Sequence, residues 1–131
     1  MKRKVLLFLS AMLIASTTLF AQGASDYIDA AQKGNAAAQC LLGYYYANGW
    51  GVEQDYNQAV RWWTLSANQG YAAAQYNLGV CYENGWVVEK NYYEAARLWK
   101  LAAEQGNGDA QWKLGGCYIR GQGVENDLEK L

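Results

Sequence analysis

Two consecutive segments decide the architecture of this 131-residue chain: NAAAQCLLGYYYANGWGVEQDYNQAVRWWTLSANQG (Asn35–Gly70) and YAAAQYNLGVCYENGWVVEKNYYEAARLWKLAAEQG (Tyr71–Gly106). They align without a gap and are identical at 20 of 36 positions, and a third copy begins at Asn107. A fixed period of this length indicates stacked units that each bury an apolar face against their neighbours. The sequence therefore predicts repeats at 35–70, 71–106 and 107–131.

The first half of each repeat predicts a helix. Counting Asn35 as position 1, repeat 1 carries Ala38, Leu42 and Tyr46 at positions 4, 8 and 12. This four-residue spacing places the three side chains on one face of a helix. Glycine follows at position 15 in every copy, as Gly49, Gly85 and Gly121. Glycine just beyond a periodic apolar segment is a helix stop signal, so we expect helix A at positions 2–14.

The second half of each repeat predicts another helix after a short loop. Asp55 and Asn91 occupy position 21 and are expected to cap the N-terminus of helix B, with Glu94 completing an arrangement close to a capping box. Helix B is expected to end at the glycine of position 36, which is Gly70 or Gly106. Glycine at position 9 lets helices approach closely, and Trp at position 29 fills the space between them. The glycines at position 9 are Gly43, Gly79 and Gly115. The prediction is an all-α solenoid.

The N-terminal segment differs from the repeats. Residues 2–4 are basic and residues 5–20 are predominantly apolar. This pattern predicts a signal peptide at 1–21 with cleavage after Ala21, or alternatively after Ala24, and an uncleaved membrane anchor is the other interpretation. Residues 25–34 match the end of a helix B, so we expect them to form an N-terminal capping helix.

The composition argues against catalysis and against the binding of nucleic acid. Beyond residue 21, 8 Lys and Arg stand against 12 Asp and Glu, a net charge of −4, and histidine is absent from the sequence. An acidic chain without a basic cluster is a poor candidate for binding nucleic acid or an anionic membrane. Histidine is the commonest general base and metal ligand. We therefore expect no catalytic residues, no metal site and no cofactor.

The three cysteines are predicted to be small semi-buried side chains rather than disulfides. Cys81 and Cys117 hold the same position in successive repeats, so their backbones should lie about 8–10 Å apart. A disulfide needs a Cα separation below about 7 Å. Cys40 lies at a different phase of its helix.

These residues closely resemble the Sel-1-like repeat family, a relative of the tetratricopeptide repeat. The pattern is met by Ala38, Leu42, Gly43, Tyr46, Gly49, Gly51, Val52, Asp55, Ala59, Trp62, Trp63, Ala67 and Gly70. The resemblance covers essentially all of residues 35–131. It implies a right-handed superhelix that acts as an adaptor for protein partners, and bacterial members occur at the cell envelope. We therefore expect an exported, periplasmic or secreted, protein-binding scaffold.

The sequence departs from the family pattern in three places. Val87 replaces the second loop glycine, which predicts a strained or rearranged loop if the backbone needs a positive φ there. In the cysteine-rich branch of the family a disulfide joins helices A and B, but the corresponding positions here hold Gln39/Ala67 and Gln75/Ala103. The third repeat ends just inside helix B. Penicillin hydrolysis, proposed for some cysteine-rich relatives, typically uses Ser-x-x-Lys, and no serine here has Lys three residues later.

Position 6 of helix A holds the candidate binding residues. It points roughly 160° away from the face formed by positions 4, 8 and 12, at ~100° per residue. We expect Tyr76 and Trp112 to form an exposed aromatic row on the concave face, or to contact the neighbouring repeat. The full candidate set is Tyr44, Tyr76, Asn77, Glu83, Asn84, Trp112, Lys113 and Arg120.

Two further expectations concern partners. The alternative function is a cell-envelope glycan or peptidoglycan receptor that uses exposed aromatic rings as stacking platforms. At the C-terminal edge, helix A of repeat 3 would leave apolar residues such as Leu114 and Tyr118 uncovered. Because solenoids normally end in a polar capping repeat, we expect further repeats or self-association to cover this edge.

Overall fold

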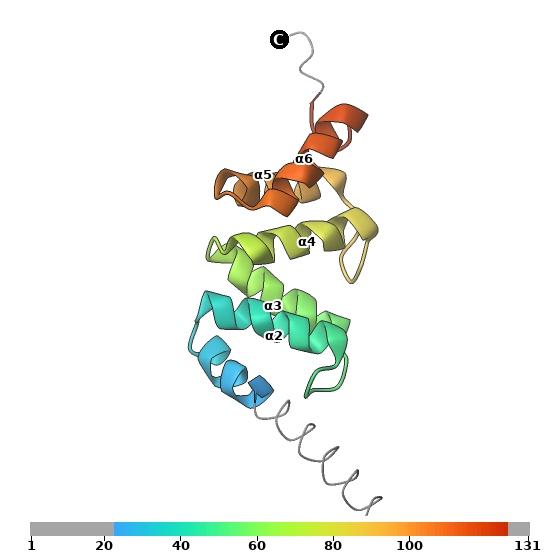
Figure 1. Ribbon diagram of the computed structural model, residues 1–131. Helices are drawn as coiled ribbons and strands as arrows, with labels where there is room; N and C mark the ends of the chain where they lie inside the picture. Colours follow the sequence, from blue (N-terminus) through green and yellow to red (C-terminus); the bar gives the residue numbers. More distant parts are fainter. Residues whose placement is uncertain (1–22, 126–131) are drawn as a thin grey trace, which may run out of the picture.

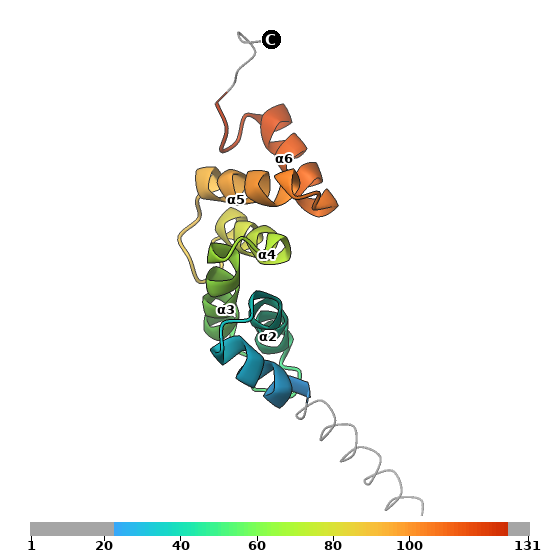
Figure 2. The ribbon, with the colours of Figure 1, turned by 90° about the vertical axis from the view of Figure 1, so that its left-hand side faces the viewer.

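The computed structural model describes residues 23–125, and this part of the chain is helical with no strand. Residues 23–32 form the first helix. It is followed by α2 (Ala36–Asn48), α3 (Tyr56–Asn68), α4 (Ala72–Asn84), α5 (Tyr92–Glu104) and α6 (Gly108–Arg120). The helices stack one after another along a single axis, as two perpendicular views show (Figures 1 and 2). The predicted all-α solenoid of 36-residue helix–turn–helix units is confirmed.

Helix A of each repeat begins and ends at the expected positions. In α2 the Asn35 side chain accepts a hydrogen bond from the backbone N–H of Ala38 at 2.9 Å. At the other end Gly49 adopts a left-handed conformation with φ 67°, and its N–H donates to the carbonyl of Tyr45. Gly85 and Gly121 end α4 and α6 in the same way, with φ of 69° and 64°. A residue without Cβ satisfies helix-end carbonyls in this conformation without steric cost.

Helix B is capped as expected at its start but ends earlier than expected. The side chains of Asp55 and Asn91 accept hydrogen bonds from the first turns of α3 and α5. The expected capping box is incomplete, because the Glu94 carboxylate pairs with Arg97. Both helices end two residues before the period-marking glycines. Gly70 and Gly106 lie instead in the following turn, with φ of 85° and 90°.

Close approach between helices A and B depends on the glycine of position 9. A Cβ atom on Gly43 would lie 2.3 Å from the Trp63 ring, and one on Gly79 would lie 2.5 Å from the Trp99 ring. Each indole N–H donates to a helix A carbonyl, Trp63 to Cys40 at 3.1 Å and Trp99 to Tyr76 at 3.2 Å. Gly115 has no such neighbour within 4 Å. The indole thus fills the space left by the missing side chain.

Buried glutamines link successive helices where the cysteine-rich branch would carry disulfides. Gln39 and Gln75 are buried. The Gln39 amide donates to the carbonyl of Ala31 at 3.1 Å, and the Gln75 carbonyl oxygen accepts from the Gln105 amide at 2.9 Å. Buried polar side chains are stable only when hydrogen-bonded. The Gln39 amide thus satisfies a carbonyl near the end of the first helix, and the Gln75 amide does the same for Ala67 near the end of α3 at 3.5 Å.

The N-terminal helix packs on repeat 1. Ala31 is buried with Ala38 and Leu42 of α2 in one apolar cluster. The predicted signal peptide (1–21) and the start of helix B in repeat 3 lie outside the described residues. Between residues 23 and 125, no helix combines the length and the apolar character that crossing a membrane requires.

Candidate functional site: the groove between repeats 1 and 2

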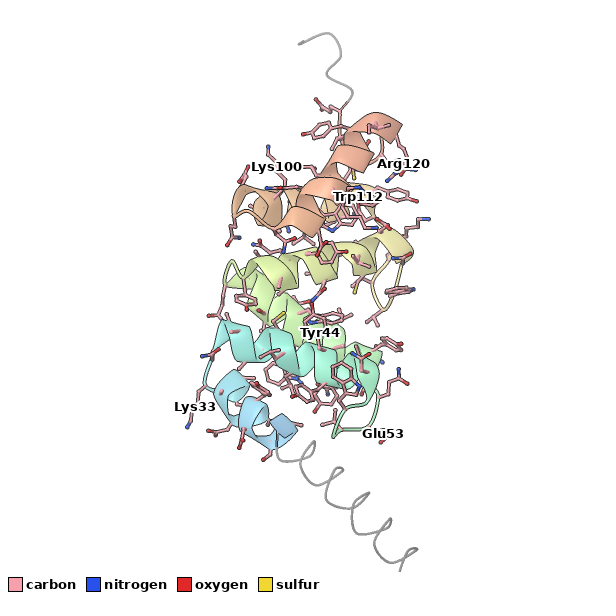
Figure 3. All side chains as sticks on the ribbon, viewed as in Figure 1. Lys33, Tyr44, Glu53, Lys100, Trp112 and Arg120 are labelled. Atoms are coloured by element: carbon pink, nitrogen blue, oxygen red, sulfur yellow. The ribbon has the colours of Figure 1, made fainter. Side chains whose placement is uncertain are left out.

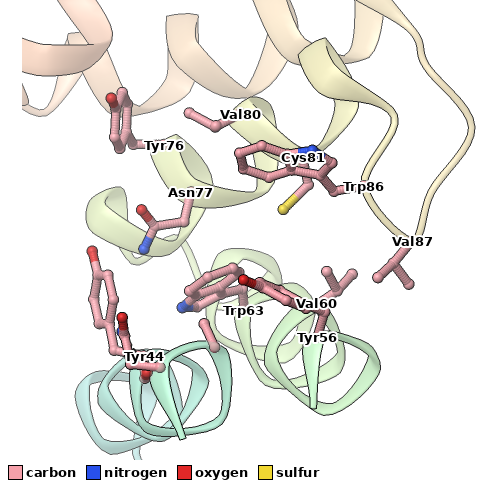
Figure 4. A pocket seen from close by; sticks show the side chains of 12 residues that line it. Tyr44, Tyr56, Val60, Trp63, Tyr76, Asn77, Val80, Cys81, Trp86 and Val87 are labelled. Atoms are coloured by element: carbon pink, nitrogen blue, oxygen red, sulfur yellow. Dashed lines mark hydrogen bonds between the residues drawn. The ribbon is translucent and has the colours of Figure 1, made fainter. Parts of the chain in front are cut away.

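A groove of about 280 Å³ runs between the first two repeats. Helices α2 and α3 form one side, and α4 with the loop that follows it forms the other (Figure 4). The side chains that line it are mostly aromatic or aliphatic. They belong to Tyr44, Ala47, Asn48, Tyr56, Val60, Trp63, Tyr76, Asn77, Val80, Cys81, Trp86 and Val87.

The groove is electrically neutral. None of the described residues that line it is acidic or basic. Burial raises the pKa of the Tyr44 hydroxyl, and a hydrogen bond with Asn77 only partly opposes this effect, so the phenol stays protonated at neutral pH. The Asn77 amide also lies 3.9 Å from the Cys40 sulfur, a contact that joins repeats 1 and 2. A neutral, largely apolar wall favours uncharged ligands, since a charged group would lose its hydration here.

The mouth of the groove is an exposed apolar patch. Tyr56 and Trp86 are each 53% exposed and Val87 is 51% exposed. With Gly85, these three residues also line an adjoining pocket of about 540 Å³. The groove and the pocket share Tyr56, Trp86 and Val87, so they form one continuous depression.

Val87 is strained. Its φ is 67°, and it is the one non-glycine residue with positive φ among residues 23–125. The equivalent residues of the other repeats are Gly51 and Gly123, with φ of 67° and 73°. The expectation of strain at this loop is confirmed. A β-branched side chain in the left-handed region is an outlier that the surrounding structure must hold in place.

Three of the predicted binding residues lie together in the groove: Tyr44, Tyr76 and Asn77. The two alternatives at position 6 each hold for one residue: Trp112 is well exposed, at 78% (Figure 3), whereas Tyr76 contacts the neighbouring repeat. Tyr76 is half-buried against the cluster formed by α5 and α6, and Cys40 is 2% exposed. Position 6 faces the following repeat, so the side chain there is covered wherever the described chain continues.

The polar candidates make contacts within the chain. Lys113 of α6 binds Glu83 of α4 at 2.9 Å, and its ammonium lies 5.5 Å from the centre of the Trp99 ring. The Asn84 amide donates to the carbonyl of Val80 at 2.9 Å. Arg120 donates to the Gln122 side chain at 3.1 Å. These residues lie away from the groove and stabilise helix ends or the junction between repeats 2 and 3.

The cysteines are free, and Cys40, Cys81 and Cys117 are more deeply buried than expected. Burial raises the pKa of the Cys40 and Cys81 thiols to about 11. Burial also raises the pKa of Cys117. Since the thiolate is the reactive form, the Cys40 and Cys81 side chains are poor nucleophiles at neutral pH.

Sequence reasoning missed the residues at the mouth of the groove. Tyr56, Trp86 and Val87 come from a helix start in repeat 1 and a loop in repeat 2. One sequence feature could have pointed to them. An exposed loop tryptophan recurs as Trp50 and Trp86, and in repeat 2 it stands directly before Val87, which replaces the loop glycine. A chain with this neutral groove and stacked helix pairs is an α-solenoid repeat protein.

Comparison with known families identifies the solenoid. Three consecutive segments match the Sel1 repeat, at residues 36–71, 72–107 and 108–130. The chain belongs to the Sel1 repeat family. No curated protein is similar enough to this chain to count as a match.

Solved structures of Sel1 repeat proteins are similar to this chain. A Sel1 repeat protein from Oxalobacter formigenes is 35% identical, with a TM-score of 0.77 over 89% of this chain and 48% of its own length. The c5321 protein, a protective antigen present in uropathogenic Escherichia coli strains and displaying an SLR fold, is 42% identical. Its TM-score is 0.72 over 76% of this chain and 21% of its own length. The chain thus spans about half of the first protein and a fifth of the second.

Proposed function

We propose that this chain is an exported, non-catalytic scaffold that binds protein partners. The observation that carries the proposal is the neutral groove between repeats 1 and 2, with three aromatic or apolar side chains at its mouth that are each more than half exposed. Aromatic side chains give a large contact area for little loss of conformational entropy and are common among interface hot spots. Sel1 repeats generally mediate protein–protein interaction, which agrees with this geometry.

Chemistry of the described residues supports a non-catalytic role. The thiols of Cys40 and Cys81 have raised pKa values, and the sequence supplies no histidine to activate them. Among residues 23–125, no three acidic, cysteine or histidine side chains are grouped so as to hold a metal ion. Binding rather than turnover is therefore the function that these side chains favour.

Export is proposed from the basic and apolar pattern of residues 1–21. The mature protein would begin near Gln22 and act in the periplasm or outside the cell. Mass spectrometry of the N-terminus of the protein recovered from cell fractions tests this. A periplasmic or secreted chain that starts after Ala21 or Ala24 supports export, whereas intact Met1 in the inner membrane contradicts it.

Partner class is tested by a direct comparison of two probes. The immobilised protein is exposed to a displayed library of random peptides and, separately, to an array of cell-envelope glycans. A scaffold for proteins should select peptides that compete with one another for one surface. Selective retention of glycans, without peptide selection, would replace this function with the receptor alternative, in which exposed rings such as Trp50 and Trp112 stack on sugars.

The exposed face of α6 is proposed as a second contact surface. Trp112 and Ile119 are 78% and 87% exposed, and a Cβ atom on Gly115 would have no neighbour within 4 Å. In repeats 1 and 2 a tryptophan of helix B packs against the equivalent glycine. Further repeats or another copy of the chain would cover this face. Light scattering that shows a monomer with a sharp, cooperative melt would contradict such coverage.

A further inference from the structure

The loop that follows α4 differs from the equivalent loop that follows α6 in how closely it approaches the preceding helix B. In repeat 3 a Cβ atom on Gly123 would lie 2.1 Å from the backbone oxygen of Tyr92, so the loop rests against the start of α5. No β-branched residue fits there unless the loop moves. In repeat 2 the same position is Val87, and a pocket of about 540 Å³ lies between this loop and Tyr56 at the start of α3.

The Val87 side chain lines that pocket and is not part of the core. It is 51% exposed and belongs to none of the three buried clusters of the described chain. Figure 4 shows it on the loop, facing the groove beside Tyr56 and Val60 of α3. The strain at Val87 is therefore not offset by core packing. Strain of this kind concentrates at binding sites, where the position of one side chain matters more than the stability of its loop.

The matching positions in the other repeats lack this arrangement. Tyr92, the counterpart of Tyr56, is only partly exposed, and the ammonium of Lys90 lies 4.9 Å from the centre of its ring. Trp50, the counterpart of Trp86, packs edge-on against Tyr45 with ring centroids 6.1 Å apart, and Gly51 follows it. Only the junction between repeats 1 and 2 combines an open tyrosine, an open tryptophan and an aliphatic residue on the loop within residues 23–125.

Resting on the protein-binding function proposed above, we infer that this mouth is a specificity pocket that holds an aliphatic side chain, such as leucine, from an uncharged segment of a partner protein. Tyr56, Trp86 and Val87 supply apolar contact on its sides, and among residues 23–125 no charged group lines the pocket or the groove behind it. A Lys or Glu side chain would be desolvated without a counter-charge. A sugar is a poorer fit, because its hydroxyls need many polar partners and the pocket mouth offers mainly carbon.

The test uses the protein expressed from the full sequence and labelled with ¹⁵N, with three end-blocked peptides and one sugar as probes. The probes are acetyl-Gly-Ser-Leu-Ser-Gly-amide, the same peptide with Glu or Lys in place of Leu, and chitotriose as a sugar. The leucine peptide should shift the Trp86 indole and Val87 amide signals and leave the Trp50 indole signal in place. The Glu and Lys peptides and chitotriose should not shift Trp86.

Two variants separate the pocket from general apolar binding. Val87→Gly should weaken the leucine peptide about tenfold, because it removes the aliphatic wall while relieving the strain on the fold. In Trp86→Ala the leucine peptide should no longer shift the Val87 amide signal, whereas the matched Trp50→Ala should bind the peptide as the unaltered chain does. Equal binding by Val87→Gly, or equal shifts from the Lys and Glu peptides, would overturn the pocket.

The outcomes also distinguish this inference from the protein-binding function. Peptide shifts that map only to another surface, such as α6, would overturn the pocket and leave the scaffold function standing. Shifts with chitotriose and with none of the peptides would overturn both.

Discussion

The junction between repeats 1 and 2 and the junction between repeats 2 and 3 share a backbone design and differ in side chains. Asn77 and Ala47 hold the positions in the first junction that Lys113 and Glu83 hold in the second. In the second junction these two residues form a largely covered ion pair, and the Lys113 ammonium lies 5.5 Å from the centre of the Trp99 ring. In the first junction an amide and a methyl group leave a neutral groove. The repeats thus share one framework. We call the first junction open and the second, where the Glu83–Lys113 pair links α4 and α6, closed.

The largest expected effect concerns the framework that both junctions share. Gly79→Ala should lower the free energy of unfolding by about 1–3 kcal/mol, because the new Cβ atom would lie 2.5 Å from the Trp99 ring. Gly115→Ala is the matched control at the same repeat position, where nothing lies within 4 Å. It should raise the free energy by about 0.5–1 kcal/mol through helix propensity. Urea titrations of both variants measure the difference, and equal effects would contradict close packing at position 9.

The next effect concerns the loop of the open junction. Val87→Gly should raise the free energy of unfolding by about 1 kcal/mol, since the left-handed strain is relieved and part of the gain is lost to the greater freedom of the unfolded chain. The reciprocal change Gly51→Val places a β-branched residue at φ 67° and should lower the free energy by a similar amount. Thermal melts of the two variants test this. A Val87→Gly variant that melts at a lower temperature would show that the side chain stabilises the fold.

The smallest expected effect is the ion pair of the closed junction. A double-mutant cycle with Glu83→Gln and Lys113→Met should give a coupling of about 0.5–1 kcal/mol, because both side chains are largely covered. The control pair Asp29–Lys33 has side chains that are 70% and 75% exposed and should show little coupling. If the two couplings are equal, the ion pair does not close the junction.

Features within one repeat could be predicted from the sequence, whereas features between repeats could not. Gly49 and Asp55 mark helix boundaries through local backbone chemistry, so the loop and the helix caps could be predicted directly from the sequence. The strain at Val87 followed from comparing three copies of one loop. The groove needs the relative placement of two repeats, which local patterns do not contain. For the same reason the sequence left position 6 open between an exposed face and a contact with the neighbouring repeat, and in the structure Asn77 of the next repeat lies against Cys40.

The central claim is that the open junction, and not the closed one, binds partner segments. The most direct measurement introduces the charged residues of the closed junction at the equivalent positions of the open one. The double variant Ala47→Glu and Asn77→Lys places an equivalent of the Glu83–Lys113 pair in the groove. Calorimetry then follows binding of the leucine peptide to the double variant, with circular dichroism melts as the check on folding. We predict that affinity falls at least about tenfold while the melting temperature is kept or raised. Unchanged affinity in a folded double variant would contradict the account.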